Sequence, residues 1–220
     1  PGSYRDRAAV FPHIVLDEPN QPSPDHLRRP RTAVFAGRLL PWKGVSLALR
    51  AISLSPGWHL TICGDGPDRA RLQRLAGKLG LSDRVTFAGW LPRQQLRSVL
   101  GSSEVFLFPS LHDEGGWVVT EALQAGAAVI CLDIGGPPEL VSGSGVVVAA
   151  SGSMEDIAQR LASALDRARP GTQTNGADRF LIDNRTEELH LLLEARFPEL
   201  FATRTPQMIP EEAAGGRAQL

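Results

Sequence analysis

The sequence predicts an α/β fold in which six parallel strands form a doubly wound sheet with helices on both faces. Six short apolar runs rich in Val, Ile and Phe support this fold, and each ends at or near a glycine or a proline. A stretch with a helical pattern separates each run from the next. Strands that are apolar on both faces are covered on both faces, as they are in parallel sheets flanked by helices.

The elements follow one another in regular alternation. The predicted strands occupy residues 32–37, 59–66, 84–89, 104–110, 127–133 and 145–150. The predicted helices occupy residues 43–55, 68–80, 93–103, 118–126, 137–143, 153–170 and 186–201. This order predicts a Rossmann-like sheet, in which ligands bind beyond the carboxyl ends of the strands. The loops that follow the strands are therefore the places to look for function.

The chain divides into three predicted segments. Residues 1–31 are rich in Pro and charge and are predicted to form a linker or arm, of which residues 1–3 are set aside as a candidate tag remnant. Residues 32–202 are predicted to form the Rossmann-like domain, and residues 203–220 a disordered tail.

Composition limits the classes of function. Apolar residues make up 42% and charged residues 21%, as in ordinary soluble globular proteins. A formal net charge of -1 argues against nucleic acid or an anionic membrane surface as a partner. Cys63 and Cys131 lie in predicted strands, where buried free thiols are favoured over a disulfide, and this predicts a cytoplasmic protein. No Cys/His cluster in the sequence has zinc spacing.

The loop after the first predicted strand reads "GRLLPWKGV" and carries two cations, Arg38 and Lys43. Gly44 then opens a helix, and the N-terminus of a helix attracts anions. Lysine occurs at only one other position, Lys78, so a lysine in this loop indicates a need for a compact point charge. The loop is predicted to bind an anion, and the alternative is a pair of solvated surface charges.

The loop after the second predicted strand reads "CGDGPDRARL". Gly64 and Gly66 permit close approach of the backbone to a ligand. A dinucleotide fingerprint would need a third glycine at the position of Arg69, so NAD binding is disfavoured. A nucleotide contact and a simple tight turn both remain open for this loop.

The loop after the fourth predicted strand reads "PSLHDEGGWVV". Gly115 and Gly116 expose backbone N–H groups in front of a helix, and Glu121 lies about one turn into that helix. A carboxylate can accept hydrogen bonds from two adjacent hydroxyls, as on a ribose. The alternative is that Asp113 and Glu114 only cap the helix and that Glu121 lies on a solvated face.

Four strings occur in order between Thr32 and Val148: "GRLLPWKG", "ICGDGPDRARL", "GLSDRVTFAGWLP" and "SSEVFLFPSLHDEGGWVVTEALQAGAAVICLDIGGPPELV". Together they resemble the C-terminal, donor-binding domain of GT-B glycosyltransferases of the retaining, group 1 type. The resemblance implies one half of a GT-B fold. It also implies transfer of a sugar from a nucleotide diphosphate sugar to an acceptor, with retained configuration.

The resemblance implies roles for particular residues. Arg38 and Lys43 would be catalytic, because they would hold the donor diphosphate and stabilise the charge that develops on it in place of a metal. Neither a metal nor a cofactor is then expected. Glu121 would bind the ribose hydroxyls. The remaining donor-binding residues, which line the base or present N–H groups to sugar and phosphate, would be Gly37, Gly64, Trp90, Leu91, Gly116, Trp117 and Val118.

This sequence departs from the family pattern at the first acid of the motif. The family has Glu, seven residues and a second Glu, with Gly-Phe-Gly after the first. Counting back from Glu121 gives Asp113, and Glu114 and Gly115 then stand where the family has Gly and Phe. Either Asp113 contacts the sugar with a shorter side chain, or the loop shifts and Glu114 does so.

The family also has an N-terminal domain that carries most of the acceptor site. That domain is expected as a partner in cis or in trans, and this chain alone is expected to be inactive. Contact with a membrane surface is expected only through the partner domain. The alternatives are a non-catalytic nucleotide-binding or scaffold module, and a GT-B relative such as a sugar-nucleotide epimerase.

The last predicted helix has an apolar stripe at helical spacing. In the family this helix packs on the partner domain, but covering the core of its own domain is the preferred interpretation here. The stripe consists of Leu189, Leu192, Leu193, Phe197 and Leu200.

Overall fold

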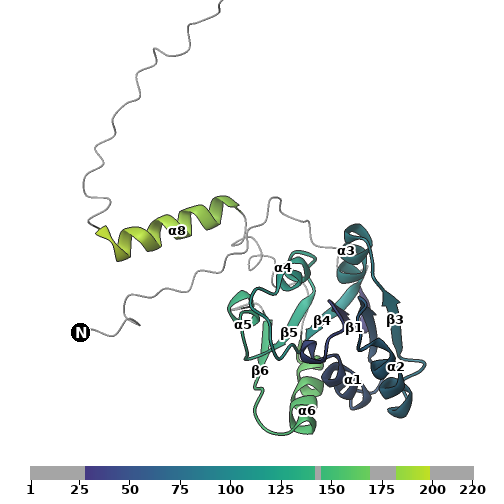
Figure 1. The fold of residues 1–220 in the computed structure, drawn as a ribbon. Helices are drawn as coiled ribbons and strands as arrows, with labels where there is room; N and C mark the ends of the chain where they lie inside the picture. Colours follow the sequence, from purple (N-terminus) through teal and green to yellow (C-terminus); the bar gives the residue numbers. More distant parts are fainter. Residues whose placement is uncertain (1–27, 142–144, 169–181, 199–220) are drawn as a thin grey trace, which may run out of the picture. The chain divides into compact units, whose positions relative to one another are not determined.

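The computed structural model of the protein describes residues 28–141, 145–168 and 182–198. Six strands form one parallel sheet in the order β3-β2-β1-β4-β5-β6 (Figure 1). The strands are β1 (Arg29–Ala36), β2 (His59–Cys63), β3 (Val85–Gly89), β4 (Ser103–Phe108), β5 (Ala128–Leu132) and β6 (Gly145–Val148). The predicted Rossmann-like, doubly wound sheet is confirmed.

Helices cover both faces of the sheet, as predicted (Figure 1). On one face α1 (Val45–Ser53) contacts α2 (Arg69–Lys78) and α6 (Met154–Leu165). On the other face α4 (Trp117–Gln124) contacts α3 (Arg93–Ser102) and α5 (Pro137–Leu140). A short 3-10 helix, η3 (Pro41–Lys43), lies between β1 and α1.

The core is deepest at the centre of the sheet. The last four residues of β1 and of β4 are buried, and all five residues of β5 are buried. Phe106 and Phe108 stack with ring centroids 5.6 Å apart, and Phe35 and Phe108 with centroids 6.1 Å apart. Burying one such ring stabilises the fold by about 2–3 kcal/mol. The central strands are thus rigid supports for the loops at their carboxyl ends.

The first strand begins three residues before its predicted start. Arg29 pairs with Ser103 of β4, and the register shifts between Arg29 and Ala33, where Arg31 has a φ of 54°. The backbone N–H of Arg31 donates to the Glu104 carboxylate at 2.6 Å. Apolar patterning does not predict this extension, because two of its three residues are arginines and pairing with β4 holds it in place.

Both cysteines are buried with free thiols, as predicted. Burial raises the pKa of the Cys63 thiol to about 11. Burial, together with the nearby charge of Asp133, raises the pKa of the Cys131 thiol to about 12. Both side chains are therefore neutral packing groups near pH 7.

The last described helix, α8 (Ile182–Arg196), begins four residues before the predicted helix. From Thr186 onward it belongs to a unit separate from the sheet and is described by itself. Leu189 and Phe197 of the predicted stripe are exposed, Leu192 and Leu193 are half-buried, and Leu200 lies outside the described residues. Its packing on a core stays a prediction, as do the domain limits.

The predicted arm is described only from Arg28 onward, and residues 1–3 and the tail 203–220 lie outside the described residues. Among the helices that the structure describes, none has the length and apolar character needed to cross a membrane.

Candidate functional site

A crevice opens at the carboxyl ends of the central strands, where β1 lies between β2 and β4. The chain winds outward from β1 in one direction through β2 and β3, and in the other direction through β4, β5 and β6. The loops after β1 and β4 therefore diverge and leave space between them. Open α/β sheets bind ligands at this kind of switch point.

The crevice has two adjoining lobes of about 410 Å³ and about 560 Å³. Both volumes lie in the range of small-molecule sites. The lobes share a wall, which consists of Ala36, Gly37, Arg38, Trp117 and Val118. A single elongated ligand could therefore extend from one lobe into the other.

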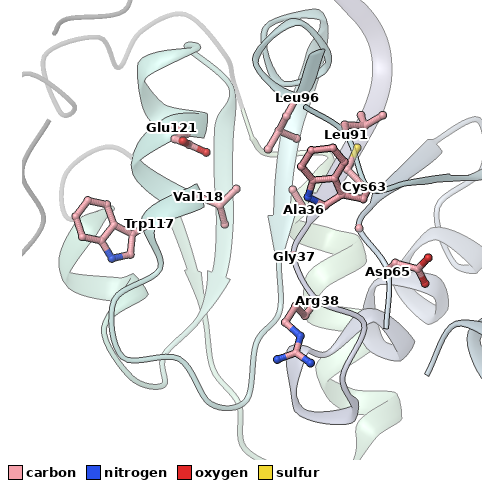
Figure 2. Close-up of a pocket in the computed structure, with 12 residues that line it drawn as sticks. Ala36, Gly37, Arg38, Cys63, Asp65, Leu91, Leu96, Trp117, Val118 and Glu121 are labelled. Atoms are coloured by element: carbon pink, nitrogen blue, oxygen red, sulfur yellow. The ribbon is translucent and has the colours of Figure 1, made fainter. Parts of the chain in front are cut away.

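The smaller lobe lies over the ends of β2 and β3 and is called the β2 lobe here. Figure 2 shows Glu121, Trp117 and Val118 of α4 on one side, facing Arg38, Asp65 and Leu91. Most of its wall is apolar or backbone, and its residues outside the shared wall are Cys63, Gly64, Asp65, Trp90, Leu91, Leu96 and Glu121. It can accept a flat, largely apolar group with hydroxyls near Glu121.

The larger lobe lies beside η3 and the end of β4 and is called the β4 lobe here. Outside the shared wall this lobe has a cation, Lys43, as well as acids, whereas the β2 lobe has acids there but no Lys or Arg. Its residues outside the shared wall are Trp42, Lys43, Phe108, His112, Asp113, Glu114, Gly115 and Gly116. This mixture suits a ligand that combines anionic groups with hydroxyls.

Close backbone packing builds the β4 lobe. Gly44 has a φ of 71°, and a Cβ atom added there would collide with the carbonyl group of Pro109. The N–H of Leu111 donates to the carbonyl of Trp42 at 2.8 Å. These contacts fix η3 against the loop after β4, so Lys43 extends over the end of β4 with its Nζ 5.8 Å from the ring centroid of Phe108.

A similar contact builds the β2 lobe. The N–H of Gly37 donates to the carbonyl of Cys63 at 3.0 Å. A Cβ atom added at Gly64 would collide with the carbonyl group of Gly37. The two strand-end loops are therefore packed backbone against backbone, which requires glycine at this position.

Asp113 links three loops of the β4 lobe. Its Oδ2 forms an ion pair with Nζ of Lys43, and its Oδ1 accepts a hydrogen bond from the N–H of Gly116 at 3.1 Å. Its carbonyl accepts from the N–H of Gly136, in the loop after β5, at 3.0 Å. The Asp113 side chain is only 12% exposed, and that of Lys43 21% exposed.

Glu121 has a different environment in the β2 lobe. Its Oε1 accepts from Nε of Arg93, the first residue of α3, at 3.2 Å. The Glu121 side chain is 19% exposed, whereas that of Arg93 is 66% exposed. A pair with one solvated partner contributes little stability, so Glu121 can exchange this partner for a ligand at low cost.

All of the residues that the sequence predicted for the site line one lobe or the other. Arg38 and Gly37 lie in the shared wall, Lys43 in the β4 lobe and Glu121 in the β2 lobe. Asp113 and Glu114 both line the β4 lobe, but the Asp113 carboxylate is already engaged by Lys43 and Gly116. Their functional roles stay predictions.

Sequence reasoning missed several lining residues. Trp42 and His112 directly precede the predicted residues Lys43 and Asp113, so their positions in those loops were a usable signal. Phe108 is the last residue of β4, and its place at a strand end was the signal for it. The contact between Arg93 and Glu121 joins α3 to α4 and had no signal in the sequence.

The described residues, 28–141, 145–168 and 182–198, include no group of three or more His, Cys, Asp or Glu side chains that could hold a metal ion.

Residues 18–176 match the sequence profile described as "Glycosyl transferases group 1". The chain is 33% identical over 141 residues to the 2-deoxystreptamine glucosyltransferase of Streptomyces kanamyceticus. This alignment covers 62% of this chain and 36% of that protein. It is 30% identical, over an alignment of 232 residues, to an exopolysaccharide phosphotransferase of Streptomyces coelicolor. That alignment covers 98% of this chain and 24% of that protein.

The fold is similar to that of the pneumococcal O-GlcNAc transferase GtfA, solved in complex with UDP and GlcNAc. That comparison has a TM-score of 0.70 at 19% identity and covers 86% of this chain and 40% of GtfA. The chain thus spans about a third of the length of the first curated relatives, 36% in each case.

Proposed function

The chain belongs to the glycosyl transferases group 1 family, and we propose that its crevice binds the donor, a nucleoside diphosphate sugar, of a retaining glycosyltransferase. One observation carries the proposal: Arg38, Lys43 and Glu121 come from separate elements and line one continuous crevice. The two cations suit the diphosphate of such a donor, and the Glu121 carboxylate suits the hydroxyls of its ribose.

The diphosphate fits the junction of the two lobes. Arg38 lies in the shared wall and Lys43 in the β4 lobe, so both cations can reach a group between the lobes. The N-terminus of α4 at Gly116 faces the same lobe and adds a positive partial charge. These groups would stabilise the negative charge that grows on the leaving diphosphate, so no metal ion is needed for that role.

The nucleoside fits the β2 lobe. Glu121 would accept hydrogen bonds from the ribose hydroxyls, and the base would lie against Trp90 and Leu91, close to the backbone of Gly64. The sugar would then lie in the β4 lobe, near Asp113 and Glu114. GtfA, which shares the fold, was solved with UDP and GlcNAc, and this supports a nucleotide of the same general class.

Transfer to an acceptor would require a second domain, in cis or in trans, that closes over the crevice. Closure excludes water and orients the acceptor for reaction. We therefore expect the 220-residue chain to bind nucleotide without catalysing transfer at a useful rate.

A second candidate is transfer of a phosphate-containing group, because the relative that aligns with 98% of this chain is named an exopolysaccharide phosphotransferase. The same diphosphate-binding cations could serve that reaction. Mass spectrometry of the product formed by the chain together with an acceptor domain distinguishes the two: transfer of a sugar adds no phosphorus to the acceptor, and transfer of a phosphate-containing group does.

Isothermal titration of the chain with UDP, GDP and ADP tests the proposal. We expect one nucleotide to bind preferentially and Lys43→Ala to weaken its binding by at least about tenfold, which is about 1.4 kcal/mol. Glu121→Ala should remove the preference for a ribonucleotide over its 2′-deoxy form. Lys78→Ala is the matched control, because Lys78 is the other lysine and lies in the last turn of α2, outside both lobes.

Equal affinities for wild type and Lys43→Ala would place the nucleotide elsewhere and contradict the proposal. Absence of binding by all three nucleotides, at concentrations up to several millimolar, would favour a scaffold role.

A further inference from the structure

Resting on the proposed function, we propose that the Asp113 carboxylate is an internal competitor of the donor diphosphate. The carboxylate takes the same donors that a phosphate group would use. Its two oxygens contact the Lys43 ammonium and the Gly116 N–H. Asp113 therefore sets how tightly the crevice binds a diphosphate and how strongly it distinguishes the complete donor from the nucleotide product.

The geometry of Asp113 is that of a bound anion. A lysine ammonium and a backbone N–H at the start of a helix are the usual ligands of phosphate oxygens. Here Oδ2 of Asp113 pairs with the ammonium, and Oδ1 accepts from Gly116 at 3.1 Å. A diphosphate that uses Lys43 and the N-terminus of α4 must share or displace both contacts.

Partial burial makes this competition significant. The side chains of Asp113 and Lys43 are 12% and 21% exposed, so solvent screens their attraction less than it screens a surface pair. Glu114, the next residue, lines the same lobe but is exposed. The two adjacent acids therefore differ in how strongly they can oppose an incoming anion.

Asp113 is not needed to hold the backbone of Lys43 in place. The N–H of Lys43 donates to Leu40 at 3.0 Å, and the carbonyl of Trp42 accepts from Leu111 at 2.8 Å. Gly44 packs directly against Pro109. Because these contacts fix η3 independently, the main effect of Asp113 on Lys43 is to neutralise its charge.

When the diphosphate displaces the Asp113 carboxylate from Lys43, the carboxylate can bind another part of the donor. Once a diphosphate takes Lys43, Asp113 is free to accept hydrogen bonds from hydroxyls of the sugar in the same lobe. The complete donor thus gains hydrogen bonds between its sugar and Asp113, which the nucleotide without a sugar cannot form. After transfer the sugar is gone, and the carboxylate returns to Lys43 and favours release of the nucleotide.

The test compares the affinities of inorganic pyrophosphate and UDP for wild type and Asp113→Asn by isothermal titration. The asparagine oxygen can still accept from Gly116, so mainly the negative charge is lost. We expect Asp113→Asn to bind both probes more tightly, on the order of tenfold. Asp113→Ser, which also retains a capping oxygen, is the second variant in case the first does not fold.

Two controls make the result specific. Asp83→Asn removes the same charge from an exposed acid outside both lobes, and it should change the affinity for UDP by less than about twofold because an exposed, distant charge is screened. In a Lys43→Ala background Asp113→Asn should not increase the affinity for pyrophosphate or UDP, because the ammonium for which Asp113 and the diphosphate compete is absent. This double-mutant cycle separates competition for Lys43 from a general change in charge.

Unchanged or weaker binding of pyrophosphate and UDP to folded Asp113→Asn overturns the inference. A gain that persists without Lys43 overturns it as well. If pyrophosphate shows the Lys43-dependent gain but UDP, GDP and ADP all fail to bind, the inference holds and the proposed nucleotide function fails. If neither pyrophosphate nor any nucleotide binds, both fail.

Discussion

The two lobes of the crevice each contain an acid paired with a cation, but the pairs differ in burial and in the number of contacts. In the β4 lobe Asp113 has a half-buried lysine and a backbone N–H as partners, and its main chain is tied to the loop after β5. In the β2 lobe Glu121 has one ion-pair contact, to the exposed Arg93. The comparison indicates that the β4 lobe, where we propose that the diphosphate and sugar bind, is held by several interlocking contacts, and that the β2 lobe, the proposed nucleoside site, is more adaptable.

The largest effect is expected from breaking the backbone contact beneath the β4 lobe. Gly44→Ala combines a left-handed φ of 71° with a collision against Pro109. We expect it to lower the free energy of unfolding by about 3 kcal/mol or more, measured by urea denaturation.

Gly77→Ala in α2 is the matched control for Gly44→Ala. No atom lies within 4 Å of the added Cβ at Gly77, and alanine favours a helix more than glycine does. It should raise the free energy of unfolding by about 0.5–1 kcal/mol. A loss at Gly44 no larger than about 1 kcal/mol would mean that η3 can move away from Pro109.

An intermediate effect should separate the two acid pairs directly. Asp113→Ala leaves Lys43 half-buried without its acid and removes the hydrogen bond to Gly116, so we expect a loss of about 1–2 kcal/mol in the free energy of unfolding. Glu121→Ala removes only a partly solvated pair and should cost less than about 0.5 kcal/mol. Equal losses in thermal or urea unfolding would show that the difference in burial has no energetic consequence.

The smallest effect concerns pH and the turn that leads from the β2 lobe into α2. The Arg71 guanidinium donates to both oxygens of the buried Asp68 carboxyl at 2.5 and 2.6 Å and lowers its pKa. Because the folded-state pKa lies below the unfolded value of about 3.9, this interaction stabilises the fold above that value and is lost as the pH falls through the folded-state pKa.

We therefore expect Asp68→Asn to destabilise the protein by about 1 kcal/mol or less at pH 7. The difference from wild type should shrink as the pH falls through the folded-state pKa, in urea titrations performed at several pH values. A difference that is constant down to pH 2 would show that shape, and not charge, explains the effect.

Much of the fold could be predicted from the sequence, because strands that are apolar on both faces have few ways to be buried. The start of β1 could not, since Arg29 and Arg31 carry no apolar signal and pairing with β4 places them. The loops of the site were also predictable, because they follow the strand ends. Arg93 was missed because its role depends on how α3 packs beside α4.

The sequence by itself determined the parallel sheet, the loops at its carboxyl ends and the residues that gather there, because apolar periodicity and glycine placement are local properties of the chain. Only the tertiary structure decided which charges pair. Lys43 meets Asp113 across 70 residues, and Arg93 meets Glu121 across 28. Such contacts depend on distances and burial in the folded crevice, and these exist only once the separate loops have packed together.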